Sequence, residues 1–121
     1  MGGRNFREYQ VWKDAIAFAT YVYKVTSNLP WFEKKGLGDQ LQRAVVSISS
    51  NIAEGCARPS DADFAHFLDI ALGSAFEVES QLLIALNVGY MDKKSHDDLI
   101  EKINSIERQI TALAAKVREK R

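Results

Sequence analysis

The clearest helical pattern in the chain is the stretch 99–117, which reads LIEKINSIERQITALAAKV. Its large apolar residues recur at alternating spacings of four and three, so they share one side of an α-helix. These residues are Leu99, Ile103, Ile106, Ile110, Leu113 and Val117. Ser95, followed by Asp98 three residues later, has the spacing of a helix cap. The pattern predicts an amphipathic helix over residues 95–118.

Three further segments show helical spacing, and residues that favour helix ends separate them. Pro30 disfavours helical geometry in the preceding residue, and Gly55 and Pro59 punctuate the end of the next segment. Ser60 and Gly89 suit the start and the end of the segment after that. The predicted helices span residues 11–28, 37–57, 60–88 and 95–118. Short links between them favour antiparallel neighbours, so we predict an all-α fold, an up-down-up-down antiparallel four-helix bundle.

Length and composition limit the class of protein. The 121 residues fit a single domain, 1–121, and 46% hydrophobic with 26% charged residues is an ordinary globular balance. Cys56 is the only cysteine, so no intramolecular disulfide can form, and we expect a cytoplasmic location. No apolar run approaches the roughly 20 residues of a membrane span, so we expect a soluble protein without membrane contact.

The charges balance overall but are unevenly distributed. Sixteen basic and sixteen acidic residues give a formal net charge of zero, which removes the general attraction that drives nonspecific binding to nucleic acid. Residues 59–92 contain six acidic residues and no Lys or Arg. An acidic segment between basic ones predicts either complementary packing between helices or subunits, or a solvated acidic face.

The predicted first helix carries more apolar surface than one side of a bundle helix can bury. The expected core stripe consists of Trp12, Ala15, Ile16, Ala19, Val22 and Tyr23. Val11, Phe18, Tyr21 and Val25 lie off this stripe. Because apolar surface of this extent usually contacts a partner, we predict that Phe18, Tyr21 and Val25 contribute to a homo-oligomer interface.

The predicted second helix carries a row of polar residues at spacings of three or four. The row consists of Arg43, Ser47, Ser50, Asn51, Glu54 and Arg58. Its members share a broad face, and we expect Glu77 of the third helix to answer Arg43 across the bundle. Two interpretations stay open: a satisfied polar network that joins two helices, which we favour, and a binding surface for a ligand.

No arrangement in the sequence demands a reaction, a cofactor or a metal. Glu77 and Glu79 are two residues apart and point in different directions, so they make a poor acid/base pair. Asp63 and His66 have the spacing of part of a di-iron site, but no second unit of this kind follows. Cys56 lacks the sequence context of an activated thiolate. We therefore expect no catalytic residue, no cofactor and no metal site.

Two blocks of the sequence resemble a known bacterial family. The first is the block 50–55, which reads SNIAEG; Gln40, Arg43 and Ser47 precede it and Arg58 follows it. The second block consists of Phe64, Phe67, Leu68, Ala71, Gly73, Ser74, Glu77, Glu79 and Leu82. The opening of the chain adds Phe6, Trp12 and Ala15. Over nearly its whole length, the chain resembles the four-helix-bundle proteins named for 23S ribosomal RNA intervening sequences.

The resemblance implies a bundle that forms a ring-like homopentamer and has no established catalytic activity. It also implies a link to ribosomal RNA insertions, and a related group serves as accessory subunits of reverse transcriptases. Gln42 stands where the family often has a basic residue, and this chain is neutral overall. We therefore expect a self-associating structural or protein-interaction module, with a nucleic-acid-binding accessory protein as the alternative.

Any binding to RNA or DNA is expected to be weak and strongly salt-sensitive, because only local basic groups are available. The best candidates lie towards the two ends of the sequence: Arg4, Arg7, Lys116, Arg118, Lys120 and Arg121. A ring would repeat this cluster once per subunit, so avidity would offset weak individual contacts.

Overall fold

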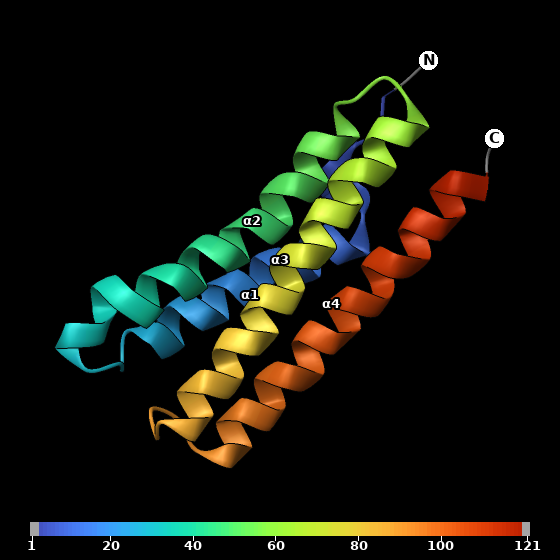
Figure 1. The fold of residues 1–121 in the computed structure, drawn as a ribbon. Coiled ribbons are helices and arrows are strands. Elements are labelled where there is room, and N and C mark those ends of the chain that lie inside the picture. Colours follow the sequence, from blue (N-terminus) through green and yellow to red (C-terminus); the bar gives the residue numbers. More distant parts are fainter. Residues whose placement is uncertain (1–2, 120–121) are drawn as a thin grey trace.

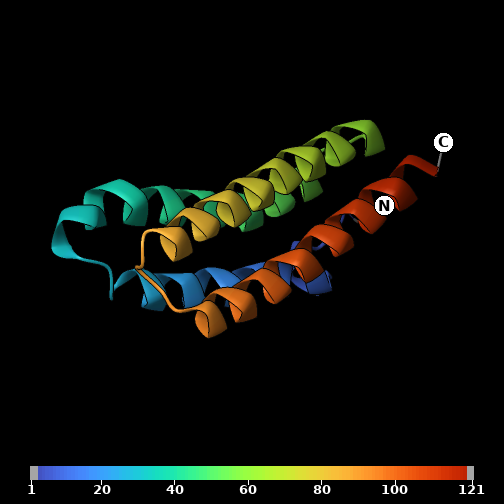
Figure 2. The same ribbon diagram turned by 60° about the horizontal axis from the view of Figure 1, so that its bottom comes forward.

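The computed structural model describes residues 3–119 and shows an all-α fold with four long helices in that range (Figure 1). The helices are α1 (Gln10–Thr26), α2 (Asp39–Cys56), α3 (Asp61–Asn87) and α4 (Lys93–Glu119). Each helix runs opposite to the one before it, and α3 lies between α2 and α4 (Figure 1, Figure 2). The predicted all-α class and its four helices are confirmed, and each predicted boundary lies within about two residues of the observed one.

The connection between α1 and α2 is partly helical. A 3-10 turn, Trp31–Glu33, leads into a short π-helix, Lys34–Gly38, which ends where α2 begins. The Glu33 carboxylate holds this segment, because it accepts hydrogen bonds from Leu37 N at 3.3 Å and from Tyr90 Oη at 2.8 Å. Since Tyr90 follows α3, these bonds tie together the two connections at this end of the bundle.

The ends of α3 match the predicted caps, whereas the start of α4 does not. Ser60 Oγ accepts a hydrogen bond from Asp63 N at 3.1 Å, and Gly89 adopts a φ of 87°, in the left-handed region that favours glycine. The predicted cap of α4 at Ser95 is wrong. Asp92 caps this helix instead: its carboxylate accepts from Ser95 N at 2.8 Å, and this bond holds the pKa of Asp92 below its usual range.

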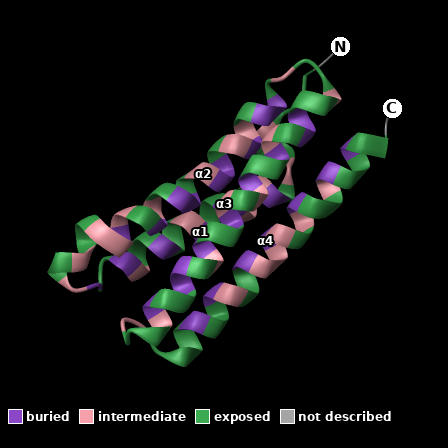
Figure 3. Ribbon diagram, viewed as in Figure 1, coloured by how far each residue is buried: buried purple, intermediate pink, exposed green. Residues whose placement is uncertain are grey.

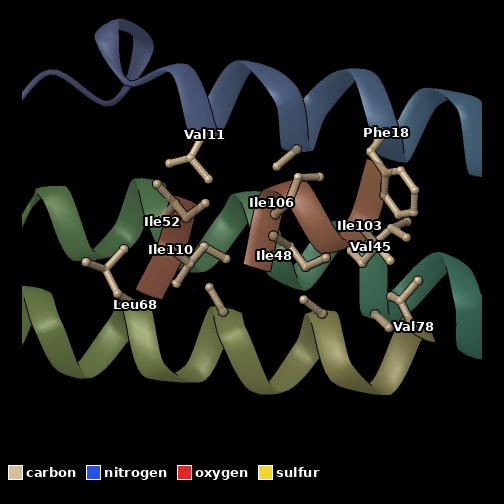
Figure 4. Close-up of a cluster of buried hydrophobic side chains, with 14 of the residues drawn as sticks. Val11, Phe18, Val45, Ile48, Ile52, Leu68, Val78, Ile103, Ile106 and Ile110 are labelled. Carbon is tan, nitrogen blue, oxygen red and sulfur yellow. The ribbon is translucent and has the colours of Figure 1, made fainter. Parts of the chain in front are cut away.

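The core runs along the middle of the bundle, where side chains of all four helices meet (Figure 4). Its largest fully buried side chains include Phe64, Leu41, Ile48, Ile52, Leu68, Leu82, Leu99, Ile103, Ile106 and Ile110. The predicted stripe of α4 is buried apart from Leu113, which is partly exposed. Exposed residues follow the outer sides of the helices (Figure 3). Within residues 3–119, no helix combines the length and the apolar content that crossing a membrane requires.

The core stripe of α1 differs from the prediction. Its buried residues are Val11, Ala15, Phe18, Val22 and Thr26. Val11 and Phe18 are only 4% and 3% exposed (Figure 4), and Val25 packs against the core. Placing these three residues off the core was therefore wrong. Conversely, Ile16 and Tyr23 are 40% and 45% exposed. Helix α1 has two apolar seams about 100° apart. The buried seam has one bulky side chain, Phe18, so this side of α1 can pack close to the other helices.

Candidate functional site

The polar row of α2 divides into an inner and an outer part. In the inner part, Ser47 Oγ lies 2.8 Å from Ser74 Oγ of α3. Asn51 Nδ2 donates hydrogen bonds to the Ser47 carbonyl oxygen at 2.8 Å and to Ser47 Oγ at 2.9 Å. These three residues form a neutral cluster, the Ser47–Asn51–Ser74 cluster, which joins α2 to α3. Its geometry is that of a polar network with a structural role.

The outer part of the row faces solvent. Ser50 and Glu54 are exposed, and Arg58 is partly buried near the end of α2. Arg58 Nη2 lies 3.6 Å from Glu54 Oε2, and the Arg58 guanidinium lies 4.8 Å from the centroid of the Phe67 ring. Arg58 therefore packs against α3, whereas the ion pair is half exposed and contributes little to stability.

The expected contact between Arg43 and Glu77 is absent. Arg43 is exposed and makes no ion pair or hydrogen bond with any residue between 3 and 119. Gln81 Nε2 lies 3.3 Å from Glu77 Oε2 and 3.5 Å from Gln40 Oε1, so Gln81 lies between Glu77 and Gln40 of α2. The rotation of α2 explains the difference, because the side of the helix that contains Gln40 and Ser47 meets α3 and turns Arg43 outward.

Two of the basic residues predicted to contact nucleic acid form contacts within the subunit. Arg4 Nη1 donates to the Arg58 carbonyl oxygen at 2.8 Å, and the Arg4 guanidinium pairs with the Asp61 carboxylate. Arg118 Nη2 lies 2.6 Å from Asp69 Oδ2. Asp61 and Asp69 both belong to α3, whose acidic charge thus neutralises part of the predicted basic surface. The Arg4 pair is partly buried, whereas the Arg118 pair is about half exposed.

The other basic candidates are not drawn into the bundle in this way. Lys116 is exposed, and Arg7 is exposed with its guanidinium 4.8 Å from the centroid of the Phe6 ring. Lys120 and Arg121 lie outside the described residues. Of the four described candidates, Arg4 and Arg118 contact α3, whereas Arg7 and Lys116 are exposed.

Tyr21 is the exposed member of the predicted interface set. Its side chain is 42% exposed and lines a groove of about 560 Å³ between α1 and α4. Lys102 Nζ of α4 lies 5.4 Å from the centroid of the Tyr21 ring, within the range of a cation–π contact. Phe18 also lines the groove, although it is almost fully buried.

A carboxyl pair between α3 and α4 was missed by the sequence analysis. Asn104 Nδ2 donates hydrogen bonds to Glu79 Oε1 at 3.2 Å and to Glu107 Oε1 at 3.0 Å. Glu107 Oε2 is buried and has no hydrogen-bond partner among residues 3–119. Burial, reinforced by the adjoining Glu79 carboxyl, raises the pKa of Glu107 to about 7. The only sequence signals were the three-residue spacing of Asn104 and Glu107 and the place of Glu79 beside a core stripe.

The carboxyl pair lies in an open apolar groove of about 660 Å³, which we call the α3/α4 groove. We define the groove by Phe76, Glu79, Leu83, Ile100, Asn104 and Glu107. Phe76 and Leu83 are 55% and 49% exposed, so large apolar side chains stand beside ionisable ones. His96 also lines the groove, and Arg108 lies next to Glu107 in its continuation along α4. Such a site combines apolar contact area with unsatisfied hydrogen-bond acceptors.

A second apolar surface follows α1 and α2. We call it the α1/α2 face, and it consists of Trp12, Ile16, Ala19, Tyr23 and Val46. Its α1 residues repeat at spacings of four and three. At the end of α1, the buried Thr26 accepts a hydrogen bond from Gln42 Nε2 of α2 at 3.0 Å. Val46 lies four residues after Gln42 and is 44% exposed. The outer seam of α1 therefore lies beside an exposed apolar residue of α2.

The groups that most often carry catalysis are dispersed. Within residues 3–119, no three His, Cys, Asp or Glu side chains come together in a way that could hold a metal ion. Cys56 is buried, and this burial raises the pKa of its thiol, which disfavours the reactive thiolate. His66 is exposed beside Phe67.

Comparisons with known proteins agree with this fold. A crystal structure of a protein of unknown function from the S23 ribosomal protein family of Bacteroides thetaiotaomicron superposes with a TM-score of 0.81 at 24% sequence identity. The likeness covers 87% of this chain and 95% of that one. No curated protein matches the chain. The sequence pattern of the 23S rRNA-intervening sequence proteins matches residues 7–112, and the chain belongs to that family.

Proposed function

We propose that this protein is a non-enzymatic module that binds copies of itself and acts through protein contacts. The supporting observation is the amount of large apolar surface left exposed on two separate parts of one small subunit. The α1/α2 face contributes Ile16, Tyr23 and Val46, and the α3/α4 groove contributes Phe76 and Leu83. Single exposed apolar residues are ordinary, but grouped ones usually mark a surface that binds a partner.

The expected form of the assembly comes from the family resemblance, which implies a ring-like homopentamer. A ring would cover both surfaces on every subunit, whereas a dimer built on one of them would leave the other in water. A cytoplasmic location goes with this proposal, because the single buried Cys56 needs no oxidising environment.

The alternative, a nucleic-acid-binding accessory protein, receives less support from the geometry. Arg4 and Arg118 pair with Asp61 and Asp69, so two of the six candidate phosphate contacts are already neutralised. Phosphate contacts supply most of the affinity in nonspecific binding. The exposed Lys116 could contribute only a local contact that salt would weaken.

Light scattering after size-exclusion chromatography tests the proposal. At micromolar concentration we expect a single species close to five times the 13.6 kDa subunit mass. The mass should persist in moderate salt, because apolar contacts carry the interaction. A species of one subunit mass at micromolar concentration would contradict self-association. Fluorescence anisotropy with structured RNA at several salt concentrations tests the alternative on the same sample.

A further inference from the structure

The α1/α2 face and the α3/α4 groove lie on opposite flanks of the subunit. Around the bundle, α1 contacts α2, α2 contacts α3, α3 contacts α4, and α4 returns to α1 (Figure 2). The surface between the first two helices is therefore turned away from the surface between the last two. One subunit cannot bring these surfaces together, but two copies can.

The two surfaces differ in charge. Helix α3 contains five acidic residues and no Lys or Arg, and the groove beside it contains the carboxyl pair of Glu79 and Glu107. Two exposed cations border the α1/α2 face: Lys13 precedes Ile16 by three residues, and Arg43 precedes Val46 by three. Among residues 3–119, neither cation has an ion-pair partner. The carboxyl pair of the groove, which Arg108 adjoins, and the two cations beside the α1/α2 face are therefore opposite in charge.

The hydrogen-bonding groups are complementary in the same sense. In the groove, Asn104 supplies one amide nitrogen to two carboxyls, and Glu107 Oε2 is buried without a donor from any described residue. A buried acceptor without a hydrogen bond lowers the stability of the fold unless a proton or a donor reaches it. The α1/α2 face offers donors in Lys13, Arg43 and the exposed hydroxyl of Tyr23.

Shape and apolar content also agree. The groove has a volume of about 660 Å³, which is large enough for several side chains, and Phe76, Leu83 and Ile100 line it. Ile16, Tyr23 and Val46 are exposed along the opposite flank by 40%, 45% and 44%. Apolar contact between these two sets would bury the surface that a lone subunit leaves in water.

We propose that the α1/α2 face of one copy binds the α3/α4 groove of the next, with a cation of the face at the carboxyl pair of the groove. This inference rests on the proposed self-association and specifies its contact. Because each subunit then uses two different surfaces, the contact is head-to-tail, and it leads to a closed ring or to an open filament. The Lys or Arg side chain of the neighbouring copy then neutralises the Glu107 carboxylate, as a bound proton does in the lone subunit.

Cross-linking through introduced cysteines tests the pairing. Ile16→Cys places a thiol on the face and Leu83→Cys places one in the groove; both sites are exposed, so neither change empties the core. We expect a short bismaleimide to give a ladder of covalent oligomers with the double variant. Each single variant alone should stay monomeric on a denaturing gel. The parent protein is the control, because its Cys56 is buried.

The outcomes separate the two proposals. Efficient cross-linking of either single variant to itself would show contact between like surfaces and would overturn the head-to-tail pairing while keeping self-association. An oligomer by light scattering without any ladder would place the interface elsewhere, with the same consequence. If the parent protein is a monomer, both proposals fail, and the groove then serves another occupant.

Charge reversal gives a second test that does not depend on cross-linker reach. Glu107→Lys puts a cation opposite Lys13 and Arg43, and we expect it to raise the dissociation constant of assembly by about tenfold or more. Adding Lys13→Glu and Arg43→Glu to the same chain should restore most of the affinity. Circular dichroism checks that each variant stays helical. If the compensating changes weaken assembly further, the proposed charge pairing is wrong.

Discussion

Two polar clusters bridge neighbouring helices in this bundle, and they differ in their balance of hydrogen-bond donors and acceptors. In the Ser47–Asn51–Ser74 cluster, hydroxyl and amide groups supply donors as well as acceptors, so the bonds close on one another. In the carboxyl pair, one Asn104 amide faces Glu79 and Glu107, and an acceptor is left over. The first cluster can be complete within one subunit, whereas the second needs a proton or an outside donor.

The largest expected effect comes from removing the only bridging donor of the carboxyl pair. Asn104→Ala leaves Glu79 and Glu107 facing each other without a hydrogen bond between helices, and we expect a loss of about 1–3 kcal/mol of unfolding free energy at pH 8. The loss should be smaller at pH 5, where a proton can lie between the carboxyls. Urea unfolding at the two pH values measures it. Thr111→Ala, exposed on the same side of α4, is the matched control.

A smaller loss of unfolding free energy is expected when hydrogen bonds of the Ser47–Asn51–Ser74 cluster are removed. Ser47→Ala removes the hydroxyl that contacts Ser74 and accepts from Asn51, and neutral hydrogen bonds of this kind contribute about 1 kcal/mol each at most. The loss should not change between pH 5 and pH 8, because no member of the cluster titrates in that range. Ser50→Ala, on the exposed side of α2, is the control. A pH-dependent loss for Ser47→Ala would remove the distinction between the two clusters.

A third prediction concerns the proton of the carboxyl pair. Because the pKa of Glu107 is raised from 4.5 to about 7 in the lone subunit, the folded subunit under dissociating conditions holds this proton more tightly than the unfolded chain between those pH values. Stability should therefore fall as the pH rises from about 4.5 to about 7, and then level off. Besides Glu79 and Asn104, Arg108 acts on this group, and its charge opposes the shift.

Glu107→Gln removes this titration. We expect the variant to be more stable than the parent at pH 8 by at most about 1 kcal/mol, since solvent screens the open groove. At about pH 4 and below, where Glu107 is mostly protonated in both states, the two proteins should have nearly the same stability. Thermal unfolding over a series of pH values compares them. An unchanged pH profile in Glu107→Gln would mean that another group holds the proton.

The sequence predicts the helices well where one apolar seam is present. Helix α4 has a single seam at spacings of four and three, and four of its residues, Leu99, Ile103, Ile106 and Ile110, are fully buried. Helix α1 has two seams about 100° apart, and local spacing does not decide which of them packs. That choice depends on how closely the other helices approach, so Phe18 and Ile16 were exchanged in the prediction.

The same reasoning explains what could be predicted of the candidate site. Ser47 and Asn51 lie on one helix at a spacing of four, so their contact follows from helical geometry. Glu79 and Glu107 lie on different helices, and their proximity depends on the rotation of α3 against α4. No spacing within one helix encodes that rotation. The same is true of Arg43, which α2 turns toward solvent.

The smallest expected change in the stability of the subunit is that of Arg43→Ala. Arg43 is exposed and has no ion pair among residues 3–119, so its removal should change unfolding free energy by less than about 0.5 kcal/mol. If Arg43 instead serves the carboxyl pair of a neighbouring copy, the same variant should assemble more weakly. Unfolding under dissociating conditions and light scattering across a dilution series measure the two quantities separately. Arg43→Lys keeps the charge and should assemble more strongly than Arg43→Ala. Equal assembly of the parent, Arg43→Ala and Arg43→Lys would leave this conspicuous unpaired cation without a role in self-association.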